Sequence, residues 1–218
     1  MNQFKIMFIR ISRSIKKLYR SLFPSFIMYL KSEVGPSGTL LDLGCGNDSP
    51  AKFLDAEFKV GVDIYDPYIK ESKKRKLHNA YMLADVTKLE FKRKSFDTVL
   101  ALDIIEHLNK EDAVKLIKKM ESWAKKKIVI YTPNGFLHQE EYDNNPFQIH
   151  KSGWSVDELR AMGFKVHGIH GLKFLRKEMA GIRFKPEFFW KIISDITQRI
   201  TYHFPELAFQ LLAIKELE

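Results

Sequence analysis

The sequence predicts a doubly wound α/β fold built on a mainly parallel sheet. Short apolar runs alternate with helical patterns from residue 40 to residue 172, as expected of parallel strands joined by helices. Glycines and acidic residues follow several of these runs, where open sheets of this class bind ligands. The length of 218 residues, with 45% apolar and 29% charged residues, suits one globular domain with an appendage.

The residue pattern in the first half of the domain predicts five strands and three helices. Its opening strand is a short apolar run of the kind that a parallel strand shows when helices cover both of its faces. The other strands have the same character, and polar helical patterns separate them. The predicted strands are residues 40–43, 58–62, 80–83, 95–101 and 127–131, and the predicted helices are residues 51–55, 67–76 and 110–123.

The second half begins with a long loop at residues 132–153. Ser155 then caps a helix that reaches Met162, and residues 164–169 and 207–215 are the last two predicted strands. Residues 173–205 between them are too long for a hairpin and predict a helical insertion. Its apolar face, with Phe189, Ile193, Ile196 and Ile200, is expected to pack in the core or against a second copy of the chain. A membrane-facing patch is the alternative.

Residues 1–31 differ from the rest, so two regions are expected: this basic segment, and a single domain at residues 32–218. The segment holds seven Lys or Arg and no acid, and the remainder has 29 bases against 27 acids. Apolar residues recur at helical spacing over residues 4–22, which predicts an amphipathic basic helix ending near Pro24. Peripheral contact with an anionic membrane is one interpretation, and packing on the domain or over its pocket is the other.

Composition also bears on partners and location. A domain that grips nucleic acid nonspecifically carries a basic excess on its folded body, and this body is close to neutral, so nucleic acid is disfavoured. Cys45 is the only cysteine, which rules out an internal disulfide. No segment resembles a signal peptide or a spanning helix of about 20 residues. We therefore expect a cytoplasmic protein.

The stretch LLDLGCGNDSP, residues 40–50, is expected to form the heart of a binding site. Gly44 and Gly46 remove side chains at the carboxyl end of the first strand, which lets the chain turn and lets a ligand approach the backbone. Asp48 or Ser49 can cap the next helix, with Pro50 in its first turn.

Acids follow the next strands. Asp63 comes 19 residues after Gly44, the spacing at which a carboxylate accepts the hydroxyls of a ribose. Asp85 ends the third strand and could hold an adenine amino group while Val86 covers the ring. Each signal is weak alone, because an acid after a strand often only starts a turn. Their combination predicts an adenosine-type cofactor.

The order DLGCG, VGVDI, ADVTKLEF, FDTVLALDIIEHL and KIVIYTPNG resembles the class I S-adenosylmethionine-dependent methyltransferases over residues 39–172. The resemblance implies a Rossmann-like, three-layer αβα fold with seven strands, the last antiparallel between the fifth and sixth. It implies S-adenosylmethionine as the cofactor. It also implies the cofactor-binding residues Asp42, Gly44, Cys45, Gly46, Asp63, Ile64, Asp85, Val86, Leu102 and Asp103.

One position departs from the family pattern, because Asp48 replaces the third loop glycine. This change narrows the loop but still permits a tight turn. A nicotinamide dehydrogenase fits less well, since its third glycine would fall at Ser49.

The sequence thus predicts an enzyme that transfers a methyl group to a small polar acceptor, such as a sugar or glycan precursor. The long loop TPNGFLHQEEYDNNPFQIHKSGWS is rich in groups that suit such an acceptor, although long surface loops are often polar without function. One alternative is a membrane-surface methyltransferase acting on a lipid or lipid-linked substrate. A noncatalytic S-adenosylmethionine-binding protein is the other. The oligomeric state is open, and a dimer is one option.

Methyl transfer to a hydroxyl requires a base, and histidine is the natural residue for that role. His107 and His150 are the candidates, with His138 in the same loop; for His107, capping and packing of the EHL turn is the competing interpretation. No metal site is predicted, because the chain has no CxxC or HExxH pattern. A site at Glu106 and His107 is a weaker alternative.

Overall fold

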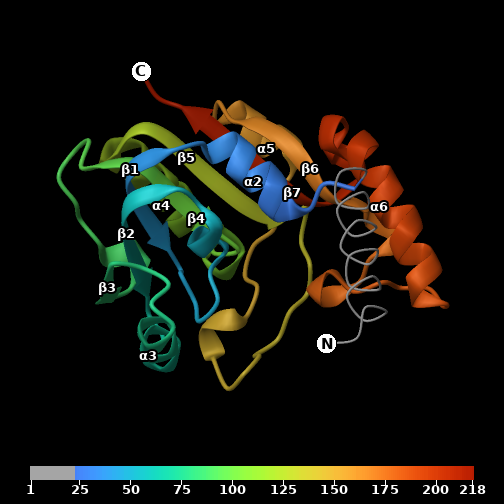
Figure 1. Ribbon diagram of the computed structural model, residues 1–218, viewed down its shortest axis with the longest axis horizontal. Helices are drawn as coiled ribbons and strands as arrows, with labels where there is room; N and C mark the ends of the chain where they lie inside the picture. The colour runs from blue at the N-terminus through green and yellow to red at the C-terminus, as the bar shows by residue number, and fades with distance from the viewer. Residues whose placement is uncertain (1–22) are drawn as a thin grey trace, which may run out of the picture.

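The protein is seen in a computed structural model that describes residues 23–218 (Figure 1). Seven strands form one sheet in the order β3-β2-β1-β4-β5-β7-β6. Neighbours from β3 to β5 are parallel, and β7 is antiparallel between β5 and β6, which confirms the predicted topology. The strands are β1 (Ser37–Leu43), β2 (Ala56–Asp63), β3 (Ala80–Leu83), β4 (Phe96–Leu102), β5 (Ala124–Pro133), β6 (Lys165–Leu172) and β7 (Ala208–Glu216).

Two apolar cores lie on opposite faces of this sheet, so the fold has three layers. Alternate strand residues point to opposite faces, and Leu41 and Leu43 enter one core while Leu40 enters the other. Helices α4 (Lys110–Trp123) and α5 (Val156–Ala161) cover the first core. Helix α2 (Phe26–Val34) covers the second, with Tyr202 of α6 (Glu187–His203) packed against it. Helix α3 (Asp66–Lys74) joins β2 to β3.

Helix α2 is an element that the sequence analysis did not predict. It starts after Ser25 and ends at Gly35, whose φ of 67° lets its N–H reach the carbonyl of Lys31. Leu30 and Val34 bury its inner face in the second core. The predicted basic helix over residues 4–22 lies outside the described residues.

Most other boundaries agree within a few residues, and β3 and α4 agree at both ends. The predicted helix at residues 51–55 is instead a 3-10 turn, Pro50–Phe53, with the Ser49 side chain accepting the N–H of Ala51. No helix within residues 23–218 is long and apolar enough to cross a membrane.

Within the described residues, most of the apolar face of α6 lies outside the core, which corrects one of the two expectations for it, while packing against a second copy stays a prediction. The helix buries Ser194, Gln198 and Thr201 against β6, where glycines allow a close approach. A Cβ at Gly168 would lie 2.1 Å from the carbonyl oxygen of Thr201. Because this polar face is the one that packs, an apolar stripe points outward; we call Phe188, Phe189, Ile192, Ile196 and Ile200 the α6 stripe. Figure 1 shows α6 at one end of the sheet, beside β6.

Candidate functional site

Two adjoining cavities open at the carboxyl ends of the parallel strands, the edge at which open α/β sheets bind ligands. The larger has a volume of about 540 Å³ and the smaller about 250 Å³. The loop after β5 contributes to both walls. The residues shared by the two walls are Gly44, Gly46, Asp103, His107 and Gln148.

The smaller cavity is bordered by two carboxylates that end strands β2 and β3. Asp63 accepts the N–H of Gly46 through Oδ2 and that of Tyr65 through Oδ1, both at 2.8 Å. Each carboxylate oxygen keeps a free lone pair for a ligand hydroxyl. Burial raises the pKa of Asp63, and the two backbone hydrogen bonds oppose this shift. The geometry leaves Asp63 free to bind two hydroxyls, as a ribose requires.

Asp85 lies further along the same wall, with Ile64 and Val86 supplying apolar surface. Its Oδ1 accepts both the N–H and the hydroxyl of Thr87, at 3.0 and 2.7 Å. These bonds keep the pKa of Asp85 low despite partial burial and fix the carboxylate at the cavity. A planar ring with an amino group fits between such apolar and acidic surfaces.

Positive φ angles shape the glycine loop, with 66° at Gly44 and 55° at Gly46. A Cβ at Gly44 would lie 2.5 Å from Cδ1 of Ile104, so only glycine leaves that side chain in place. Cys45, between them, lines the larger cavity, and burial raises the pKa of its thiol, which keeps it neutral. Asp48, at the family's third glycine position, lines the larger cavity and pairs with Lys52 and Arg75.

Asp42 lies behind the loop and lines neither cavity. Its Oδ2 accepts the hydroxyl of Ser49 at 2.6 Å and lies 2.8 Å from Nε2 of His78. These contacts tie β1 to the start of the next turn and to the segment before β3. In this structure Asp42 therefore supports the loop from beneath, and its predicted place beside the methionine amino group stays a prediction.

Asp103 ends β4 with a φ of 52° and borders both cavities. Its Oδ1 accepts a hydrogen bond from the amide of Gln210 at 3.1 Å, and Gln210 in turn accepts the hydroxyl of Tyr131. Burial raises the pKa of Asp103 to about 7. Leu102, just before it, lines the larger cavity.

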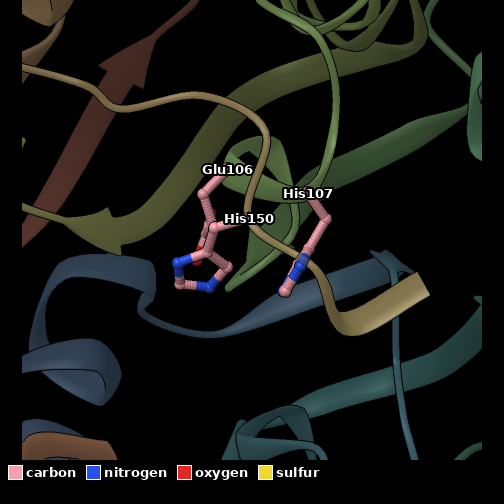
Figure 2. Close-up of side chains that lie close together, drawn as sticks. All are labelled: Glu106, His107 and His150. Atoms are coloured by element: carbon pink, nitrogen blue, oxygen red, sulfur yellow. The ribbon is translucent and has the colours of Figure 1, made fainter. Parts of the chain in front are cut away.

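Glu106, His107 and His150 lie together on the wall of the larger cavity (Figure 2). All three are buried, and one ligand atom of each lies within 4.8 Å of the others. The Glu106 carbonyl accepts the N–H groups of Lys151 at 2.8 Å and Ser152 at 3.0 Å, which docks the loop of His150 onto the turn after β4.

Of the ten predicted cofactor-binding residues, the structure brings seven to the smaller cavity and two more, Cys45 and Leu102, to the larger one alone. Asp42 reaches neither, and His138 has an exposed side chain outside both walls. Sequence reasoning missed Gln210 and Tyr131. A single amide within the apolar strand FQLLAI was the available signal for Gln210. The seven residues are Gly44, Gly46, Asp63, Ile64, Asp85, Val86 and Asp103.

Known proteins agree with this fold. Residues 41–131, which run from β1 to β5, match the family model of a methyltransferase domain. This match and the Rossmann-like sheet confirm the resemblance to the class I S-adenosylmethionine-dependent methyltransferases.

Individual relatives are distant. An uncharacterised protein of Methanocaldococcus jannaschii is 29% identical over 140 residues, 62% of this chain, and the match spans 59% of that protein's length. A SAM-dependent methyltransferase from Archaeoglobus fulgidus shares the fold with a TM-score of 0.53, 19% identity and coverage of 93% of this chain and 99% of that one. N-methyltransferase NodS from Bradyrhizobium japonicum, in complex with S-adenosyl-L-homocysteine, has a TM-score of 0.57, 12% identity and coverage of 92% and 86%.

Proposed function

We propose that this chain transfers a methyl group from S-adenosylmethionine to a small polar acceptor such as a sugar or glycan precursor. One observation carries the proposal: the smaller cavity, where Asp63 suits a ribose and Asp85 an adenine amino group, meets the larger cavity at Gly44, Gly46, Asp103 and His107. The adenosine part would occupy the smaller cavity and place its sulfonium at this junction. The acceptor would enter from the larger one.

The bonds that form and break in this reaction belong to the two reactants, so the protein itself needs little covalent chemistry. An acceptor lone pair attacks the methyl carbon, the carbon–sulfur bond breaks with its electron pair passing to sulfur, and S-adenosylhomocysteine leaves. The protein has to align the two reactants and exclude water. The polar groups of the larger wall can orient an acceptor with several hydroxyls: Tyr131, Gln139, Tyr142, Gln148 and Gln210.

An acceptor hydroxyl must also lose its proton, and His107 and His150 are the predicted bases. Nδ1 of His150 lies 2.6 Å from the carbonyl of Leu137, and Nδ1 of His107 lies 3.3 Å from that of Ile149. Nε2 is therefore the free nitrogen of each ring. Burial lowers the pKa of both, to about 4 for His107, so both are neutral near pH 7 and His107 is a weak base.

The α6 stripe favours the membrane-surface enzyme as a second candidate. Phe188 is 70% exposed, Ile196 51% and Ile200 54%, and exposed Arg183 and Lys185 lie just before the helix. Aromatic and aliphatic side chains beside bases suit the interface of an anionic bilayer. In this version the acceptor would be a lipid or a lipid-linked sugar.

An acceptor screen with methyl-labelled S-adenosylmethionine tests the proposal. Free sugars, nucleotide sugars and lipid-linked sugars would be offered to the full chain, with label in the product as the readout. Transfer to a soluble sugar supports the first candidate, and transfer only to vesicle-borne substrates supports the second. Cofactor binding without transfer to any acceptor class would favour the noncatalytic alternative.

A further inference from the structure

The cluster of Glu106, His107 and His150 has the composition of a metal site, and it adds His150 to the Glu106 and His107 pair that the sequence offered as a weaker alternative. Glu106 and His107 adjoin each other in the chain, but His150 arrives from a loop 43 residues later. Two imidazoles and one carboxylate are a ligand set that proteins use for divalent transition metals. Figure 2 shows the three side chains projecting into one space.

The ring orientation of both histidines suits metal binding. Their Nδ1 atoms face backbone carbonyls, of Leu137 for His150 and of Ile149 for His107. Metal-binding histidines usually make this contact through the second ring nitrogen, because it fixes the tautomer and the orientation of the ring. Nε2 of each ring then carries a free lone pair that can bind a metal ion.

Glu106 supplies a second, independent observation. Its side chain is buried, its Oε2 accepts the hydroxyl of Thr132 at 2.9 Å, and its Oε1 has no hydrogen-bond partner. A buried carboxylate oxygen without a partner is costly. A cation beside Oε1 would supply the partner that this oxygen lacks.

We propose that Glu106, His107 and His150 bind a divalent transition-metal ion at the wall of the larger cavity. Imidazole favours ions such as Zn²⁺, Fe²⁺ or Co²⁺ over Mg²⁺ and Ca²⁺, which prefer oxygen ligands alone. Ligand bonds of about 2.1 Å allow donor separations of at most about 4.2 Å. The present separations of up to 4.8 Å mean that binding draws the side chains slightly together.

Three protein ligands leave coordination positions open toward the cavity, as in catalytic metal sites. If the proposed methyl transfer holds, on which this role rests, the open position takes the acceptor oxygen. The cation then lowers the pKa of the bound hydroxyl, whose proton passes to water before the oxygen attacks the methyl carbon. A histidine bound through Nε2 cannot accept that proton, so this role replaces the one predicted for His107 and His150.

Binding of Zn²⁺ and Co²⁺ to the full chain, stripped with a chelator, tests the site without reference to activity. Calorimetry should give one ion per chain for each metal, and Co²⁺ should develop the visible absorption of nitrogen and oxygen coordination. Glu106→Gln and His150→Ala should each weaken binding by at least about 100-fold, beyond the 10–100-fold typical of lost outer contacts. Glu106→Gln keeps an oxygen for Thr132, so a folded variant is expected.

His138→Ala is the matched control, because His138 lies in the same loop with an exposed side chain outside the cluster. It should bind both ions as the unaltered chain does. Equal affinity in the unaltered chain and in Glu106→Gln, or no ion bound, would overturn the site. Parallel titration with S-adenosylmethionine distinguishes the two proposals. Cofactor binding without metal binding would contradict only the cation site. Metal binding without cofactor binding would contradict only the proposed function.

Discussion

The N–H of Gly46 donates to the carboxylate of Asp63 across 2.8 Å, which links the loop after β1 to the end of β2. The residue predicted to bind the ribose thereby also shapes the loop predicted to hold the methionine end. Both features depend on the strand order, because β1 and β2 are parallel neighbours with carboxyl ends at one edge. Substitutions in the loop and at Asp63 should therefore affect cofactor binding together.

A comparison of Gly44→Ala with Gly46→Ala should distinguish the effect of backbone strain from that of a steric clash beside the cofactor cavity. Both glycines have positive φ, so each alanine should lower the free energy of unfolding by about 1–2 kcal/mol. Only at Gly44 would the new Cβ collide with Ile104, which borders the smaller cavity. We expect Gly44→Ala to weaken S-adenosylmethionine binding at least tenfold more than Gly46→Ala in calorimetry. Similar affinities for both variants would contradict the placement of the cofactor.

Asp42 and His78 form a buried pair, and His78→Ala should show how much this pair contributes to the free energy of unfolding. Nε2 of His78 lies 2.8 Å from the Asp42 carboxylate, and a hydrogen bond to a charged group contributes about 1.5–3 kcal/mol. Urea denaturation measures this loss. His138→Ala, at an exposed histidine, should change the free energy of unfolding by less than about 0.5 kcal/mol. Equal stability of the two variants would show that the pair contributes nothing to the fold.

The half-buried ring of His170, which lines the larger cavity, should make stability depend on pH. Burial and the charge of Arg176 lower its pKa to about 4, below the unfolded value of about 6.5. As pH falls from about 6.5 to 4, the unfolded chain takes up a proton that the folded chain refuses, so stability decreases. His170→Asn tolerates the φ of 68° and does not titrate. Its free energy of unfolding should fall less with acidification, by roughly 1–3 kcal/mol over this range.

Urea titrations of both proteins at several pH values check this expectation. Other groups titrate in the same range, but they are common to the two proteins and cancel in the difference. Parallel pH profiles of the unaltered chain and His170→Asn would exclude His170 as a source of acid sensitivity.

The α6 stripe should decide between a soluble and a membrane-bound acceptor. If it contacts lipid, Ile196→Ser with Ile200→Ser should reduce sedimentation with phosphatidylglycerol vesicles at least tenfold, since each buried side chain contributes about 1.5–3 kcal/mol. Met82→Ser with Leu83→Ser is the control, because these exposed residues lie on β3 at the other edge of the sheet. Deleting residues 1–22 measures how much the basic segment contributes to vesicle binding. Absence of vesicle binding by the unaltered chain would exclude the membrane candidate.

Most of the fold could be predicted from short stretches of the sequence. The central strands are short apolar runs that are buried on both faces, and α4 repeats its apolar residues at helical spacing, so the residue pattern located them. Helix α2 was missed although Ser25 and Gly35 are ordinary start and stop signals, because Pro24 was interpreted only as the end of the basic helix before it. The outward turn of the α6 stripe has no local signal. It follows from the glycines of β6, which admit a polar helix face at close range.

The site was predictable only where its residues follow strands. Asp63 and Asp85 end β2 and β3, so the strand order brought them to one edge. His150 lies in a loop without periodicity, and backbone hydrogen bonds to the carbonyl of Glu106 hold that loop in place. Such bonds leave no trace in residue types, which is why the cluster emerged only in three dimensions.

The central claim is that Asp63 and its cavity bind the methyl donor, and calorimetric titration with S-adenosylmethionine tests it most directly. We predict one molecule bound per chain, with Asp63→Ala at least about 100-fold weaker, because hydrogen bonds to a charged group contribute about 1.5–3 kcal/mol each. Asp66→Ala, at a half-exposed carboxylate outside both cavities, should bind normally. Failure of the unaltered chain to bind, or equal binding by Asp63→Ala, would contradict the claim.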